Sequence, residues 1–183
     1  MYIIKDKSFI SMFVLLIVIG LAPAAISAAP ADDNRAPELP SPLCDRVNVP
    51  AGSRLHSHAF ATGVQVYRWD GSAWVFVQPV ANLFANADYT GQIGTHYAGP
   101  TWESNSGSKV VGVRLFGCQP DPTAIPWLRL EAVSTSGPGI FNSVTFIQRL
   151  NTTGGVAPTS PGLIVGQTVE VPYTAEYFFY RED

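Results

Sequence analysis

The sequence predicts an all-β protein, a single domain that folds as an antiparallel β-sandwich or a short closed barrel. From Val47 onward, short alternations of apolar and polar residues are broken roughly every eight to fifteen residues by Gly, Pro, Asn or Asp. No stretch of about ten residues carries apolar side chains at helical spacing. Seven or more strands in about 140 residues need a second sheet or closure into a ring, because either arrangement covers the edges of a large sheet.

The composition supports one packed domain and argues against disorder. Of 183 residues, 46% are hydrophobic and 11% aromatic, and only 14% are charged, compared with roughly 25% charged in an average globular chain. The net charge is −3. Beyond the first thirty residues only Lys109 and eight scattered arginines are basic. No basic stripe is available to neutralise phosphates, so we expect no nucleic-acid partner.

Residues 1–29 have the three-part pattern of a secretory signal peptide. Lys5 and Lys7 precede an almost unbroken apolar run at 9–20, and small residues follow it. The alternative is a membrane anchor, but the run is shorter than the roughly 20 residues that a spanning helix needs, and Pro23 follows. We therefore expect a secreted protein, extracellular or periplasmic, with no stable membrane span after cleavage.

Residues 30–46 are predicted to form a Pro-rich linker, and 47–183 the β-domain. The linker contains four prolines and no hydrophobic periodicity. Cys44 and Cys118 are the only cysteines. In an oxidising compartment this even count favours one disulfide, with two unpaired buried thiols as the alternative.

The clearest local signal is a β-hairpin at residues 63–78. Asp70-Gly71 separates two β-rich runs and is typical of a two-residue type I′ turn, which would place Tyr67 opposite Trp74. Valines line one face of this hairpin. The other face is the aromatic face, a candidate stacking surface for a ligand that is either covered by a second layer or open to solvent; it carries Gln65, Tyr67, Trp69, Trp74 and Phe76.

Three later segments are also predicted to be strands. In residues 127–133, Leu128 and Leu130 alternate with polar residues, as in a half-buried strand. Residues 144–150 and 169–180 add two more. Pro172 interrupts the last one, which indicates a sheet edge or a bulge.

Three histidines and one carboxylate form the only candidate metal site. His56 and His58 lie two apart, so in a strand both would project from one face. His96 would supply a third ligand and Glu103 an acid–base group, which together would make a catalytic site for zinc or a similar ion. The alternative is that the histidines are structural and Glu103 is an ordinary surface residue, so no cofactor is our first expectation.

Motifs for nucleotide binding and for serine nucleophiles are absent. Gly137-Pro138-Gly139 is the nearest approach to a dinucleotide-binding loop, but a β-rich segment follows it and position 142 is Asn. No P-loop and no G-x-S-x-G elbow occurs. The sequence therefore argues against a nucleotide-dependent dehydrogenase. Asn151-Thr152-Thr153 matches a glycosylation sequon and is predicted to lie in a loop.

A set of segments in fixed order resembles a known family. They are GVQVYRW, HYAGPTWES followed by GSKVVG, AIPWL, GPGIFNSVTFIQRLNTTGG and VPYTAEYFFY. Together they resemble an uncharacterised family of secreted bacterial and fungal proteins that carry a domain of unknown function, over roughly Val47 to Arg181. Some members bear a transferred malate dehydrogenase label, to which the missing nucleotide motif lends no support. The resemblance implies one exported β-domain, with no known activity, ligand or catalytic residue to carry over.

Two functional hypotheses follow from these observations. The first is a binding or structural module of the cell envelope or extracellular space, whose aromatic face stacks on a carbohydrate or an envelope component. The second is a metal-dependent hydrolase that uses the three histidines with Glu103. We favour the first, and expect the protein not to be an enzyme.

Overall fold

The computed structural model describes residues 36–182 and shows an all-β protein. A short 3-10 helix, η1 (Asp45–Val47), precedes the strands. The predicted signal peptide and the first residues of the predicted linker lie outside the described residues. The strands in chain order are β1 (Ser53–Trp69), β2 (Trp74–Phe84), β3 (Gln92–Tyr97), β4 (Thr101–Ser104), β5 (Lys109–Cys118), β6 (Trp127–Ser136), β7 (Phe146–Gly154) and β8 (Thr168–Glu182).

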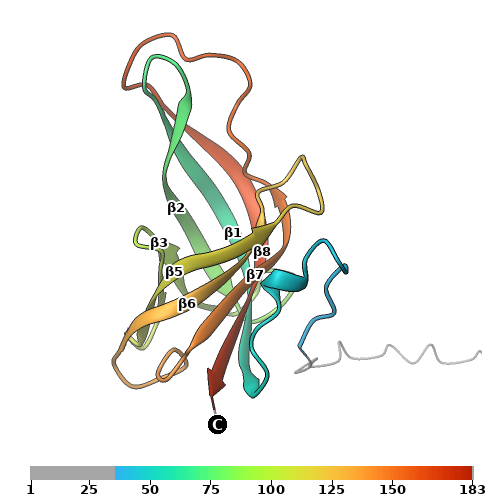
Figure 1. The fold of residues 1–183 in the computed structure, drawn as a ribbon. Helices are drawn as coiled ribbons and strands as arrows, with labels where there is room; N and C mark the ends of the chain where they lie inside the picture. The colour runs from blue at the N-terminus through green and yellow to red at the C-terminus, as the bar shows by residue number, and fades with distance from the viewer. Residues whose placement is uncertain (1–35, 183) are drawn as a thin grey trace, which may run out of the picture. The chain divides into compact units, whose positions relative to one another are not determined.

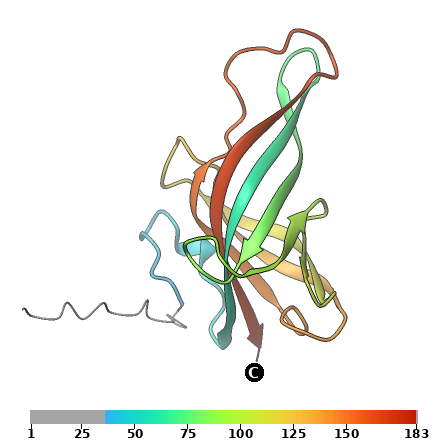
Figure 2. The same ribbon diagram turned by 180° about the vertical axis from the view of Figure 1, so that it is seen from behind.

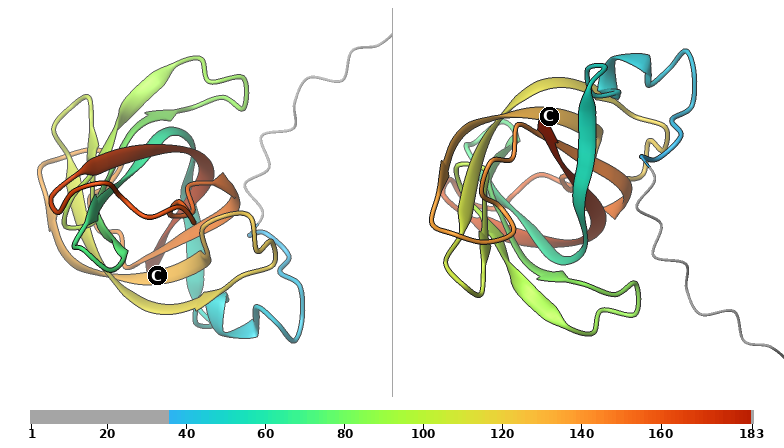
Figure 3. Two further views of the ribbon diagram at one scale, coloured as in Figure 1. Left: turned by 90° about the horizontal axis from the view of Figure 1, so that it is seen from above. Right: turned by 90° about the horizontal axis from the view of Figure 1, so that it is seen from below.

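The strands form a closed up-and-down barrel. Each strand pairs antiparallel with the next in sequence, and β8 pairs with β1 to complete the ring (Figure 1, Figure 2). The closing seam is long, running from Ser53 opposite Glu182 to Arg68 opposite Thr168. Seen along its axis, the sheet encloses one interior (Figure 3). Of the two predicted architectures the barrel is therefore present, and closure leaves no sheet edge to cover.

Alternation along each strand fills the interior. In β1, Ala59 and Ala61 are buried while their neighbours are more exposed. In β6, Leu128 and Leu130 face inward as predicted. Gly63 lies in the middle of β1, where a Cβ would be 2.2 Å from the Val80 carbonyl oxygen. The absence of a side chain there lets β1 and β2 approach closely as the long strand bends around the barrel.

One end of the barrel is closed by the β6–β7 connection. Phe141 is fully buried and Val144 is 3% exposed, and both belong to the interior core. The Phe141 ring packs 4.7 Å from that of Phe179 on β8. The Phe141 backbone N–H also donates to Ser108 Oγ in the β4–β5 connection. We call Phe141 and Val144 the plug, because they fill the interior at this end.

A second cluster, the outer core, lies on the outside of β7 and β8. Its members are Cys44, Val47, Cys118, Leu150, Phe178 and Tyr180. The Cys44–Cys118 disulfide is present, as predicted, and ties the segment before β1 to the end of β5. Gln148 Nε2 donates to the Val47 carbonyl at 2.7 Å. The described part of the predicted linker, residues 36–46, is therefore packed on the barrel through Cys44.

The β1–β2 hairpin has a longer turn than predicted. Trp69 pairs with Trp74 and Tyr67 with Phe76, so the loop is Asp70 to Ala73 and not a two-residue turn. Asp70 Oδ1 accepts the backbone N–H of Ser72 and of Ala73, which stabilises the four-residue loop. The shift is two residues, which leaves Tyr67, Trp69, Trp74 and Phe76 on their predicted face. The prediction was wrong for Val77, because a bulge opposite Val66 and Tyr67 places it beside the interior with Phe76 and not on the valine face.

Two further predictions concern β7 and β8. Pro172 lies within continuous β8, and its carbonyl accepts the Gly155 N–H just beyond the last residue of β7. In a strand, the N–H and C=O of one residue point toward the same neighbouring strand. The backbone N–H that proline lacks would therefore point toward the end of β7, where pairing stops and the sheet has a local edge. Asn151 was predicted to lie in a loop, but it lies in β7, beside the register shift between Leu150 and Thr153.

Within residues 36–182 no helix is long and apolar enough to span a membrane.

Candidate functional site

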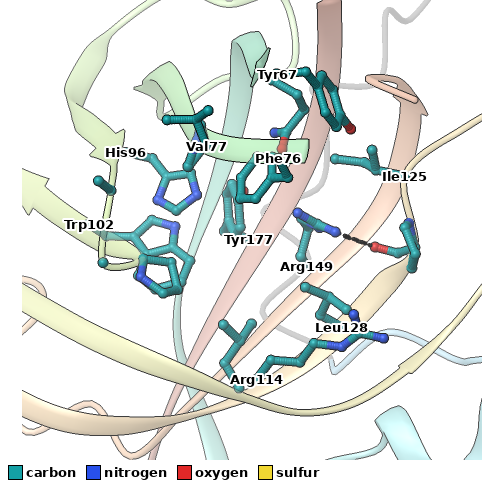
Figure 4. A pocket seen from close by; sticks show the side chains of 17 residues that line it. Tyr67, Phe76, Val77, His96, Trp102, Arg114, Ile125, Leu128, Arg149 and Tyr177 are labelled. Atoms are coloured by element: carbon teal, nitrogen blue, oxygen red, sulfur yellow. Dashed lines mark hydrogen bonds between the residues drawn. The ribbon is translucent and has the colours of Figure 1, made fainter. Parts of the chain in front are cut away.

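The interior is open at the end opposite the plug. Here lie the β1–β2 hairpin and the β3–β4, β5–β6 and β7–β8 connections, which we call the mouth. A cavity of about 430 Å³ enters the barrel at the mouth (Figure 4). Its lining is mostly apolar or aromatic and consists of Gln65, Tyr67, Phe76, Val77, Pro79, His96, Ala98, Gly99, Pro100, Trp102, Arg114, Ile125, Pro126, Leu128, Leu130, Arg149 and Tyr177.

Aromatic rings form the floor of the cavity. His96 stacks on Trp102 with ring centroids 4.4 Å apart and planes within 14°. Tyr177 meets the Trp102 ring edge-on at 5.3 Å. The three side chains come from β3, β4 and β8 and are almost completely buried. Their mutual packing fixes the floor before any ligand arrives.

His96 is a neutral imidazole in this position. Its Nδ1 lies 2.8 Å from the Thr101 carbonyl oxygen, so Nδ1 carries the hydrogen and Nε2 the lone pair. Burial lowers the pKa of His96 to about 3. The histidine therefore adds no positive charge to the cavity at neutral pH, and it is a weak base.

Two arginines supply the charge of the cavity. Arg149 on β7 donates from Nε and Nη2 to the Pro126 carbonyl at 3.1 and 2.8 Å. Arg114 on β5 lies beside Leu128 (Figure 4). None of the seventeen lining residues is Asp or Glu. Within residues 36–182 neither arginine forms an ion pair.

The connections at the mouth are tied to one another. Tyr67 Oη donates to the Gly155 carbonyl at 2.6 Å, and burial raises the pKa of this phenol, which keeps it protonated. Thr152 Oγ1 donates to the Ile125 carbonyl, and Ala124 forms a bridge with Gly155. Gly155 has φ 77°, a conformation that favours glycine. These bonds hold the β5–β6 and β7–β8 connections in place around the cavity.

The predicted aromatic face divides into two parts. Tyr67 and Phe76 line the cavity, and Phe76 is 49% exposed. Further along the hairpin, the β7–β8 connection lies over Trp69 and Trp74. Trp74 Nε1 donates to the Ser160 carbonyl at 2.8 Å, and a Cβ on Gly162 would lie 2.5 Å from Trp69 Cγ. A loop, not a second sheet, therefore covers the tip of the face.

The three histidines of the candidate metal site do not converge. A bulge at His56 breaks the regular alternation between Leu55 and Ser57, so His56 and His58 do not share one face. His58 stacks on Phe178 and pairs with Glu176 at 2.9 Å, whereas His96 lies inside the barrel. Within residues 36–182 no three His, Cys, Asp or Glu side chains are grouped to hold a metal ion. The hydrolase hypothesis is not favoured.

Glu103 lies away from the cavity. It accepts hydrogen bonds from Tyr97 Oη at 2.5 Å and from Lys109 Nζ at 3.1 Å. These two contacts lower the pKa of Glu103, with the Tyr97 bond contributing most. Its neighbour Trp102 faces inward, so Glu103 points to the opposite face of the strand, away from His96. The carboxylate is held as a surface ion pair.

Sequence reasoning missed both cavity arginines. Arg149 lies two residues after Ile147, and Arg114 pairs with the inward-facing Leu130. An arginine at an inward-facing position of a predicted strand is the signal that would have drawn attention to Arg149. Arg114 was harder to find, because register shifts on both sides of it break the alternation along β5.

Comparison with known proteins places the chain in a family. A family model described as protein of unknown function (DUF3455) matches residues 50–181. The chain belongs to the DUF3455 family. No curated protein and no solved structure matches the DUF3455 chain significantly. The family match covers all eight strands up to Arg181, so the barrel and its mouth belong to the DUF3455 domain.

Proposed function

We propose that this DUF3455 protein is an exported binding module that takes a small molecule into the mouth of its barrel. The observation that carries the proposal is the 430 Å³ cavity, which is closed by the plug at one end and open at the other. Its size and largely apolar lining are typical of small-ligand sites, which generally measure roughly 300–1,000 Å³. Eight-stranded barrels have interiors of a size that suits one such ligand.

Binding is favoured over catalysis by the chemistry of the lining. The seventeen lining residues include no Ser, Thr, Cys, Lys, Asp or Glu. Among the lining residues, His96 and two tyrosines are of types that act as general bases in other proteins. The low pKa of His96 makes it a poor base, and burial raises the pKa of Tyr67 and of Tyr177, which keeps both phenols protonated. The lining thus offers surfaces for stacking and hydrogen bonding, and it lacks the hydroxyl, thiol, amine and carboxylate nucleophiles of Ser, Thr, Cys, Lys, Asp and Glu.

Export of the protein rests on the predicted signal peptide and on the disulfide. A Cys44–Cys118 bond is typical of proteins that mature in an oxidising compartment. The ligand would then be a compound of the extracellular or periplasmic space, free or as the exposed part of an envelope component or a carbohydrate. It would stack on Tyr67 and Phe76, the part of the aromatic face that the cavity includes.

A neutral fluorescent probe tests the proposed function. N-phenyl-1-naphthylamine, an uncharged aromatic compound whose emission rises in apolar surroundings, is titrated into the purified protein. We expect saturable binding of one probe per chain. Ala98→Trp, which places a large ring at the exposed rim of the cavity, should weaken binding at least tenfold.

The matched control is Ala87→Trp. Ala87 is equally exposed but lies in the β2–β3 connection at the plugged end. It should leave probe affinity unchanged. Absence of saturable binding to the unaltered protein, or equal affinity in both variants, would refute a ligand site at the mouth.

A further inference from the structure

We propose that the ligand of the mouth is an anion, a compact carboxylate or phosphate whose charged group lies between Arg114 and Arg149 and whose apolar body packs on the aromatic rings. The inference rests on the proposed function, since it concerns the same cavity. It adds the chemical class of the ligand, which the charge, hydrogen-bond donors and shape of the cavity indicate.

The two cavity arginines carry uncompensated charge. Arg114 and Arg149 bring two positive charges to one largely apolar cavity, and none of its lining side chains is acidic. Arg149 is half-buried and Arg114 is exposed. A charge that is partly removed from water, as in Arg149, is normally paired, because its removal costs free energy that a counter-charge offsets. Neither arginine has a carboxylate partner among residues 36–182. An anionic ligand would supply the missing partner.

The cavity wall has an excess of hydrogen-bond donors. Trp102 Nε1 is buried there without a hydrogen-bond partner among the described residues. The Trp102 side chain itself is 1% exposed. An indole N–H can only donate, and guanidinium groups likewise only donate. A ligand with several acceptor oxygens would accept hydrogen bonds from these donors. Carboxylate and phosphate groups carry such oxygens and form strong, charge-assisted hydrogen bonds.

The chain orients one of the two guanidinium groups and leaves space for the other. Arg149 is held by two hydrogen bonds to the Pro126 carbonyl. Gly117 leaves space for Arg114, because a Cβ there would lie 2.8 Å from Arg114 Nη2. The planar donor pairs of guanidinium groups match the paired oxygens of carboxylates and phosphates.

The remaining lining indicates the body of the ligand. Tyr67 and Phe76 meet edge-to-face, with ring centroids 5.8 Å apart, on one wall. Ile125 and Leu128 lie on the wall that carries Arg149 and Arg114 (Figure 4). A flat ring or short aliphatic chain would bury its surface against these groups. The two requirements together describe an anion with an apolar body.

Displacement of the neutral probe by matched competitors separates the effect of ligand charge on affinity from the effect of ligand shape. N-phenyl-1-naphthylamine is bound at pH 7 and displaced by 1-naphthoate, 1-naphthyl phosphate or the uncharged 1-naphthalenemethanol. The three competitors share one ring system and differ in the attached group. We expect at least one of the two anions to displace the probe at a concentration at least tenfold lower than the alcohol does. The order of the two anions identifies the preferred oxygen group.

The arginine variants test the assignment. Arg114→Gln should lower the anion's advantage over the alcohol at least tenfold, measured as the ratio of the two displacing concentrations within the same variant. Arg68→Gln is the control, because Arg68 is an exposed residue on the outer face of β1 and the change in net charge is the same. Arg149→Gln provides a second variant, in which retained probe binding verifies that the cavity is intact.

The outcomes distinguish the two proposals. Equal displacement by anions and alcohol, or an anion preference that survives both Arg114→Gln and Arg149→Gln, would overturn the anionic ligand and leave the binding cavity standing. A purely electrostatic effect at long range would show as equal losses in Arg114→Gln and Arg68→Gln, which would also overturn it. Failure of the neutral probe to bind the unaltered protein would instead refute the proposed function.

Discussion

His96 shows how the barrel interior changes the chemistry of a single residue. In the sequence it is a candidate metal ligand, but the fold stacks it on Trp102 and bonds its Nδ1 to Thr101. Desolvation then keeps it neutral over most of the pH range. His96 belongs to the floor of the cavity, where its uncharged ring packs against the ring of Trp102.

This environment predicts a loss of stability in mild acid. The pKa of His96 is about 3 in the folded protein and roughly 6.5 in the unfolded chain. Between these values the unfolded state binds the proton, so the free energy of unfolding falls as pH drops below about 6.5. From pH 7.5 to 5.0 we expect His96 to account for a loss of about 2 kcal/mol.

Urea unfolding at the two pH values measures the effect. In His96→Gln the side-chain amide can still donate to the Thr101 carbonyl but does not titrate, so the loss on acidification should shrink by about that amount. His56, whose pKa burial also lowers, contributes in the same direction and remains in both proteins. If the unaltered protein and His96→Gln lost equal free energy of unfolding on acidification, His96 would have to be accessible to water in the folded protein.

At the scale of elements, the connections decide which end of the barrel is open. The β6–β7 connection folds inward and places the plug in the core. The β5–β6 and β7–β8 connections are instead tied to each other at the rim by the Tyr67, Thr152 and Ala124 contacts. A cavity at the mouth and a filled interior at the other end follow from this difference.

Phe141→Ala tests the plug. Phe141 is fully buried against Phe179, and removal of a buried Phe ring leaves a cavity and lost transfer free energy, together about 3–5 kcal/mol. Urea unfolding should show a decrease of that size. Leu163→Ala is the control, because Leu163 is 90% exposed and should change stability by less than about 0.5 kcal/mol. Similar small effects in both variants would mean that the loop does not close the barrel.

For the whole molecule, the disulfide and the outer core join the segment before β1 to the barrel. Cys44 and Cys118 are 74 residues apart in sequence, and Gln148 bridges Val47 to Tyr180 through its side-chain amide. A cross-link over such a loop stabilises the folded state by about 4 kcal/mol in the chain-entropy account. The segment thereby covers the outside of β7 and β8.

Replacement of both cysteines by serine should lower the free energy of unfolding by about 4 kcal/mol, because the unfolded chain regains the freedom that the bond removes. Chemical denaturation of the two proteins, at equal temperature and pH, measures the difference. Treatment of the unreduced protein with an alkylating reagent is the check on the bond itself. Labelling of both cysteines without reductant would contradict the disulfide.

The sequence by itself determined the fold class, the disulfide pair and the shared face of Tyr67 and Phe76 in the first hairpin. Strand periodicity of two assigns each side chain to a face without knowledge of the partner strand. The longer Asp70–Ala73 loop moved the pairing by two residues and left Tyr67 and Phe76 on the predicted face. The chain has two cysteines, which can form only one disulfide, and the predicted export signal indicates an oxidising compartment in which that bond forms.

Only the tertiary structure decided which faces point inward and which distant residues meet. A bulge at His56 separated the histidine pair, and the inward position of His96 removed it from Glu103. Arg114 and Arg149 lie 35 residues apart in sequence, and the pairing of β5 and β7 with the two edges of β6 brings them to one cavity. Bulges and closure depend on contacts between strands far apart in the chain, and local alternation carries no information about them.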